Sequence, residues 1–147
     1  MIASFGQSER ERIEIDVISY ERSPVGEYYD DNWLTVEIRV SVGGFSGKAK
    51  AAFLTGEFVD FLAQLRSLYQ SLSGTAEFTT LEDQLRLKAT GDGKGHIQLV
   101  GNLTDQPGSG NRLHFALQFD QSQLRASIGE LEQVTSAFPV RSVEGVD

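Results

Sequence analysis

The chain of 147 residues contains no cysteine. Thiol catalysis, thiolate metal centres and a disulfide framework are therefore excluded. A chain of this length buries roughly 68–70% of the surface that it exposes when unfolded, so one domain can be stable without such cross-links. Because disulfides are rare in the cytosol, the absence of cysteine also favours a cytoplasmic protein.

Long hydrophobic runs are missing as well. The N-terminal sequence MIASFGQSERER has neither a basic start nor a sustained apolar core, so no signal peptide is predicted. No apolar run approaches the roughly 20 residues that a membrane span needs. We therefore expect a soluble protein without a membrane partner.

Basic residues are in the minority, with 13 Lys and Arg against 21 Asp and Glu and a formal net charge of −8. This balance opposes binding to nucleic acid and favours rapid association with a basic partner. The more general interpretation is that the acidity keeps the protein in solution.

One stretch, TGEFVDFLAQLRSLYQSLSG at 55–74, has a clear helical period. Thr55 can cap its start, Glu57 complements the helix dipole there, and Gly74 can close the far end. The pattern predicts a long helix over about 56–73 with one apolar face that a sheet must cover. That face consists of Phe58, Phe61, Leu62, Leu65, Leu68, Tyr69 and Leu72.

Much of the remaining chain alternates apolar and polar residues, which is typical of strands with one buried face. In the clearest segment, 32–42, the alternate residues Leu34, Val36, Ile38, Val40 and Val42 share one side. Gly43-Gly44 then predicts a hairpin with 45–53. Further strands are expected at 13–19, 75–80, 84–90, 95–103 and 112–119. Because most of the connections are too short for parallel crossovers, we predict an antiparallel curved sheet of about seven strands, a meander or half-barrel.

A second helix is predicted over about 121–136. Asp120 can cap it, Gln123 stands at the capping-box position, and Pro139 follows its end. Its buried stripe would be Leu124, Ile128 and Leu131.

The whole chain, 1–147, is therefore expected to form a single α+β domain. No second core or internal repeat marks a boundary. We expect residues 1–10 and 141–147 to be frayed tails.

Catalytic and metal chemistry find little support. His96 and His114 could face each other across neighbouring strands, but the adjacent outward residues include Arg86 and Lys88, which do not bind cations. We predict solvated histidines and no metal or cofactor.

The turn at 90–95 has the glycines of a phosphate loop without its Lys-Ser or Lys-Thr pair, so it is predicted to be a hairpin turn. Ser46 does not lie in a nucleophile elbow. The sequence therefore does not predict an enzyme.

A denser cluster consists of Tyr28, Tyr29, Asp30, Asp31 and Trp33. Its adjacent carboxylates could act as an acid–base pair or hold a hard cation, although a solvated acidic loop is the simpler interpretation. Tyrosine and tryptophan supply buried anchors at interfaces and carboxylates steer basic partners, so these residues are the candidates for partner binding. Trp33 has a structural alternative, in which its ring covers an edge of the sheet.

Several phrases resemble, in their order along the chain, the WapI-type bacterial immunity proteins. The resemblance covers roughly residues 30–140. It implies protection of a cell against a wall-associated or polymorphic toxin, and it supplies no catalytic motif. Gln123 replaces the aromatic residue that usually follows the family's Asp-Gln-Ser phrase. The matching phrases are DNWL at 31–34, GFSG at 44–47, LSGTA at 72–76, GDGKGHI at 91–97, PGSGN at 107–111, DQSQL at 120–124 and FPV at 138–140.

Two functional hypotheses follow from different classes. The first is a non-enzymatic immunity protein that binds a cognate toxin. The alternative is a small-ligand-binding or regulatory domain, in which small inward residues leave room for a pocket or, instead, let the helix approach closely. These small residues are Gly47, Ala49, Ala51, Ala76 and Ala89. Whether the protein is a monomer or a dimer is left open.

Overall fold

A computed structural model of the chain describes residues 1–142. The elements in order are β1 (Ile2–Ser8), β2 (Glu11–Tyr20), α1 (Tyr28–Asn32), β3 (Trp33–Val42), β4 (Phe45–Leu54), α2 (Thr55–Ser71), β5 (Ser73–Phe78), β6 (Leu85–Asp92), β7 (His96–Gln106), β8 (Ser109–Asp120) and α3 (Gln121–Ala137). No helix in this part of the chain is long and apolar enough to cross a membrane.

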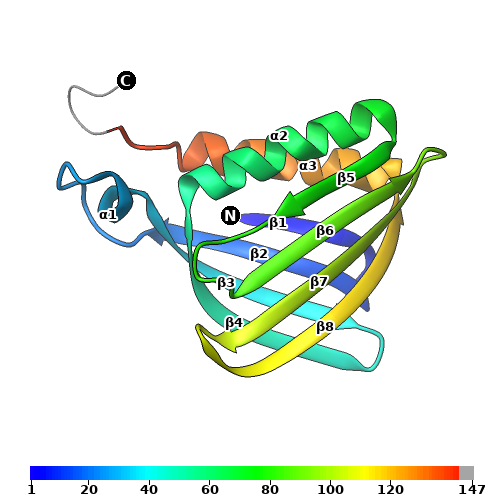
Figure 1. Cartoon of the computed structure of the whole chain (residues 1–147), viewed down its shortest axis with the longest axis horizontal. Coiled ribbons are helices and arrows are strands. Elements are labelled where there is room, and N and C mark those ends of the chain that lie inside the picture. Colours follow the sequence, from blue (N-terminus) through cyan, green and yellow to red (C-terminus); the bar gives the residue numbers. More distant parts are fainter. Residues whose placement is uncertain (143–147) are drawn as a thin grey trace.

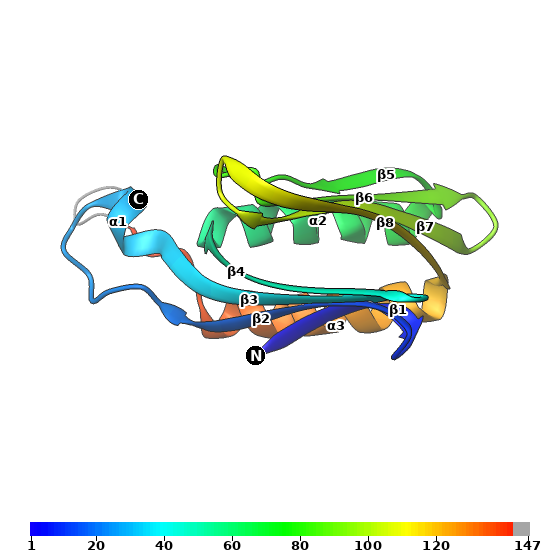
Figure 2. The same ribbon diagram turned by 90° about the horizontal axis from the view of Figure 1, so that it is seen from below.

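The α+β class is confirmed, but the strands form two sheets instead of one. The first sheet has the order β1-β2-β3-β4 and the second β5-β6-β7-β8, and all their pairings are antiparallel. Figure 2 shows the two sheets as separate layers, and Figure 1 shows α2 and α3 side by side along one margin. The sheet divides because α2 follows β4 directly and carries the chain to the second layer before β5 begins.

The apolar faces of both sheets meet in one core. The predicted inward row of β3 is buried from Leu34 to Val40, and Leu65 of α2 is fully buried. Phe53 and Phe78, from the two sheets, lie 5.3 Å apart between ring centroids, and Phe61 of α2 lies 5.2 Å from Phe78. Complete burial of such a side chain stabilises the fold by about 1.5–3 kcal/mol, so this aromatic contact helps to hold α2 on the sheets.

The caps of the two long helices agree only partly with the prediction. The Asp120 carboxylate accepts a hydrogen bond from the Gln123 N–H at 3.0 Å, as expected for α3. At the start of α2, Glu57 accepts from the Leu54 N–H at 2.7 Å, whereas the Thr55 hydroxyl donates elsewhere. The far end of α2 closes at Leu72, with φ 60°, and not at Gly74.

Residues 1–10 are not a frayed tail, because β1 forms an edge of the first sheet. Ser4 is buried, and its N–H and hydroxyl both donate to Glu130 of α3, at 3.0 and 2.8 Å. The Ser127 hydroxyl donates to the Ser4 carbonyl oxygen at 2.5 Å. Since α3 covers β1, four consecutive residues (3–6) are buried, and the alternation that identifies a half-buried strand is absent.

The first strand of the second sheet is likewise covered by a helix. At its edge strand β5, the Glu77 N–H donates to Gln64 of α2 at 2.9 Å, and the Gln64 amide donates back to the Glu77 carbonyl at 3.2 Å. At the C-terminal end, Arg141 is held by Asn32, whereas residues 143–147 of the expected tail lie outside the described residues.

Candidate partner-binding site

Two residues of the predicted aromatic–acidic cluster form an exposed pair. Tyr28 and Tyr29 are 38% and 55% exposed on α1, and their rings meet edge to face with centroids 5.4 Å apart. Figures 1 and 2 show that α1 projects beyond the sheets at one end of the molecule. The pair is therefore well placed for contact with another molecule.

Asp31 does not lie in a solvated acidic loop, as the sequence suggested, because its residue is only 3% exposed. Its two carboxylate oxygens accept hydrogen bonds from the N–H groups of Val25 and Gly26, at 2.7 and 3.0 Å. Asp31 therefore shapes the segment before α1. Asp30 stays at the surface, 3.8 Å from the Arg22 guanidinium, and Trp33 is half-buried at the start of β3.

Asn32, which the sequence analysis did not identify, holds the same region in place through hydrogen bonds of its buried side chain. Its side chain is fully buried and donates to the carbonyl oxygens of Tyr28 and Arg141, at 2.8 and 2.9 Å. Its oxygen accepts from the Thr55 hydroxyl at 2.6 Å and from the Arg141 N–H at 2.8 Å. One amide thus ties α1, the start of α2 and the C-terminal segment together. A polar residue at the start of an alternating strand gives no signal of such burial.

Two further segments lie at this end. The Tyr28 hydroxyl lies against Gly56 in the first turn of α2, and Glu57 in that turn accepts from the Leu81 N–H at 2.7 Å. The β5–β6 connection, which carries Leu81, therefore reaches the same end as α1 and the start of α2 (Figure 1). We call this surface the acidic end. Its exposed apolar and aromatic residues are Val25, Tyr28, Tyr29 and Leu81, and its carboxylates are Glu27, Asp30, Glu57, Asp60 and Glu82.

Carboxylates at the acidic end outnumber its cations, which include Arg22 and Arg141. Burial raises the pKa of Glu57, and the nearby charges of Asp60 and Glu82 raise it further. These carboxylates are therefore close enough to repel one another. A cation on a partner would relieve that repulsion.

The two histidines do not face each other. In the register of the second sheet, His96 lies opposite Asp120, and His114 lies opposite Asn102, six residues further along β7. The idea of a shared site between the two imidazoles is therefore wrong. No group of three or more His, Asp or Glu that could hold a metal ion occurs within residues 1–142.

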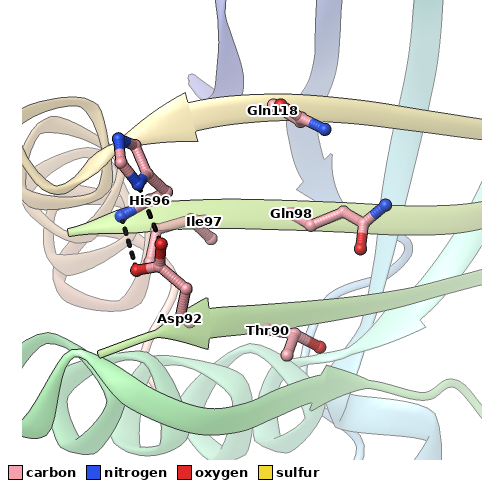
Figure 3. Close-up of a pocket in the computed structure, with 7 residues that line it drawn as sticks. Thr90, Asp92, His96, Ile97, Gln98 and Gln118 are labelled. Carbon is pink, nitrogen blue, oxygen red and sulfur yellow. Dashed lines mark hydrogen bonds and ion pairs between the residues drawn. The ribbon is translucent and has the colours of Figure 1, made fainter. Parts of the chain in front are cut away.

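His96 pairs instead with Asp92 at a shallow cavity of about 230 Å³ (Figure 3). Its Nδ1 lies 2.8 Å from an Asp92 carboxylate oxygen, while the other oxygen accepts from the N–H groups of Lys94 and His96. These bonds lower the pKa of Asp92 to about 2, with the Lys94 N–H as the largest cause. Asp92 thus closes the β6–β7 hairpin, and the turn predicted at 90–95 is confirmed.

The small inward residues considered as a pocket lining separate into two groups, apart from Ala51, which is half-buried against the core. Ala76 and Ala89 pair across β5 and β6 and are fully buried in the core, with α2 packed on β5. This is the close approach that was the alternative to a pocket. Gly47 and Ala49 instead line an open cleft of about 270 Å³ between β4 and the β7–β8 hairpin.

The fold defines a class of α+β protein in which a four-stranded antiparallel sheet followed by a long helix occurs twice. The chain belongs to the immunity protein WapI-like family, whose sequence profile matches residues 4–139. Comparison with curated protein sequences finds no match.

Two solved structures share this fold at low sequence identity. One is the plant transcriptional regulator PBF-2, with 12% identity and a TM-score of 0.53 over 94% of this chain and 81% of that one. The other is WHY1 from Arabidopsis thaliana, with 12% identity and a TM-score of 0.51 over 95% and 85% of the respective chains. At this identity the likeness concerns the fold alone.

Proposed function

We propose that this protein is a non-enzymatic immunity protein that neutralises a bacterial toxin by binding to it, and that it acts in the cytoplasm. The observation that carries the proposal is the match of residues 4–139 to a family of immunity proteins. The absence of cysteine supports the location, since the cytosol keeps thiols reduced and proteins there do not depend on disulfides.

The acidic end is the surface that we propose for this contact. Tyr28 and Tyr29 offer rigid aromatic area at low entropic cost, with Asp30 beside them. Surrounding carboxylates attract a basic partner from a distance and raise the rate of encounter. A toxin domain with a basic surface therefore fits the charge of this end.

The direct test is co-expression with the toxin encoded beside this gene. Growth should be rescued, and toxin and immunity protein should elute together from a gel-filtration column. A Tyr28→Ala, Tyr29→Ala double variant should lose both, whereas Val100→Ala, which removes an exposed apolar side chain on β7 outside the acidic end, should keep both. Failure of the natural protein to rescue growth and to form a complex would exclude the proposal.

The alternative, a small-ligand-binding domain, has less support, because the cavity at His96 and the cleft at Gly47 are both open to solvent. A thermal-shift screen separates the two functions, since a ligand that binds only the folded state raises its stability by mass action. We expect the purified toxin, and not a metabolite, to raise the melting temperature.

A further inference from the structure

The four edge strands of the two sheets are covered unequally. At β1 and β5, side chains of α3 and α2 bond the outward N–H and C=O groups of Ser4 and Glu77. At β8, the Gln7 amide bonds only the Gln118 carbonyl. At β4, the Gln84 amide bonds the Lys50 carbonyl at 2.7 Å, and Glu57 bonds the N–H of Leu54 at the end of the strand.

The register identifies which β4 groups are open. Alternate residues of an antiparallel strand direct their backbone groups to the same neighbour. Since Lys50 directs its carbonyl away from β3, Ser46 and Lys48 direct their N–H and C=O groups the same way. Nothing within residues 1–142 bonds these outward groups.

Side chains give this open edge two different faces. The exposed cations Lys48 and Lys50 lie on the outer face, where Lys48 is 3.3 Å from Glu37. On the inner face, Gly47 and Ala49 line the open cleft together with Leu103 and Leu113, and Asp105, Asn111 and Arg112 line it as well. Phe45, 71% exposed, also lines the cleft.

We propose that the β4 edge at 45–50 is a docking site for an extended segment of a partner protein, which adds antiparallel to β4 as a fifth strand. The segment alternates acidic and apolar residues. Its acidic side chains face Lys48 and Lys50, and its apolar side chains enter the cleft beside Leu103 and Leu113. Main-chain bonds supply affinity and the two faces supply specificity, as in other cases of strand addition.

The test uses the full chain and a synthetic probe, acetyl-Glu-Val-Glu-Leu-Glu-Val-Glu-amide. In the free protein the Ser46 and Lys48 amides should exchange rapidly with deuterium, and saturating probe should protect both. Protection already present without probe would show that the edge is occupied by another group, such as a second copy. That result, or no protection with probe, would overturn the proposal.

Backbone pairing is tested on the probe, without any risk to folding. In antiparallel pairing the residues opposite Lys48 share its face and direct their N–H groups towards β4. N-methylation of the central glutamates should therefore weaken binding about tenfold. N-methylation of the two valines, in a probe of the same composition, should change it little. Equal losses for the two probes would contradict the proposed register.

Charge is tested on the protein. The double variant Lys48→Glu, Lys50→Glu should bind the probe about tenfold more weakly, because two cross-strand attractions become repulsions. Lys88→Glu with Lys94→Glu changes the net charge equally at exposed positions of the second sheet that do not line the cleft, and should leave binding within about twofold. Equal effects of the two double variants would show that Lys48 and Lys50 do not select the acidic side chains of the segment. Because no toxin enters these experiments, their outcome is independent of the proposed immunity function.

Discussion

Short polar side chains decide how the acidic end is built. Asp31 and Asn32 are adjacent, and both are buried with their hydrogen-bonding atoms occupied by backbone groups or by Thr55. Burying an amide whose hydrogen bonds are all made lowers the stability of the fold little. Removing that amide lowers it much more, because its buried partners are left without hydrogen bonds. The exposed tyrosines therefore depend on residues that a partner cannot reach.

Asn32→Ala should lower the free energy of unfolding by about 2–4 kcal/mol, because the Thr55 hydroxyl and the Arg141 N–H lose a buried acceptor. Urea unfolding measures this loss. Asn111→Ala, which removes a surface bond of 3.1 Å to Asp105, is the control and should cost less than about 1 kcal/mol. Equal costs would show that the bonds of Asn32 do not stabilise the fold.

Asp92 should titrate at a pKa of about 2, because the Lys94 N–H and the His96 ring both favour its ionised form. The folded-state pKa lies below the usual aspartate value of 3.8, so this contribution to stability is present above pH 3.8 and is lost as the pH falls towards 2. Carbon NMR of the carboxyl group gives the pKa directly.

Replacing the ring partner tests the cause. His96→Ala should raise the Asp92 pKa only part of the way to 3.8, since the largest cause, the Lys94 N–H, remains. His114→Ala should leave it unchanged, because that ring lies opposite Asn102. A full return to 3.8 in His96→Ala would contradict the assigned order of causes.

Among the elements, the two long helices protect strand edges as well as filling the core. Gln64 of α2 and Glu130 of α3 satisfy backbone groups that would otherwise offer pairing sites to other chains. Within residues 1–142, nothing bonds the outward groups of the β4 edge at Ser46 and Lys48, which is why we assign this edge a partner.

Glu130→Ala should destabilise the protein by about 1–3 kcal/mol and speed deuterium exchange at Ser4, since the buried N–H and hydroxyl of Ser4 lose an ionised acceptor. Glu132→Ala is the matched control in the same helix. Its 3.6 Å pair with Arg66 is exposed and should contribute less than about 1 kcal/mol. Unchanged exchange at Ser4 would mean that Glu130 does not hold β1.

The sequence predicted elements whose signals are local. The alternation at 34–42, the helical period at 55–74 and the Asp120 cap each report on nearby residues, and the structure confirms them. It did not predict β1 or the division into two sheets, because these depend on which distant segments pair. The burial of Asn32 and the separation of His96 from His114 likewise depend on how distant segments are aligned. Local sequence patterns carry no information on that alignment.

At the scale of the whole molecule, the net charge of −8 is distributed unevenly. Acidic residues at the acidic end exceed the nearby cations. Of these, Arg22 and Arg86 are paired with Asp30 and Asp83, and Arg141 lies over the Tyr20 ring. Such a local excess governs association rates more than the total charge does.

Reversing Asp60 and Glu82 to lysine should slow association with the cognate toxin roughly tenfold at low salt. Stopped-flow kinetics at two ionic strengths measures the effect, which should shrink as salt screens the charges. Glu9→Lys with Glu11→Lys, in the β1–β2 hairpin, changes the net charge by the same amount and should slow association much less. If the two double variants behave alike, the total charge, and not the acidic end, sets the rate.

The covering of strand edges is reciprocal between the halves of the chain. The helix that ends the first half protects β5 of the second, and the helix that ends the second half protects β1 of the first. During synthesis on the ribosome, the edge of β1 therefore stays uncovered until α3 has been made. Throughout synthesis the nascent chain carries an unprotected sheet margin, so a stalled or truncated product is the form of this protein most prone to aggregate.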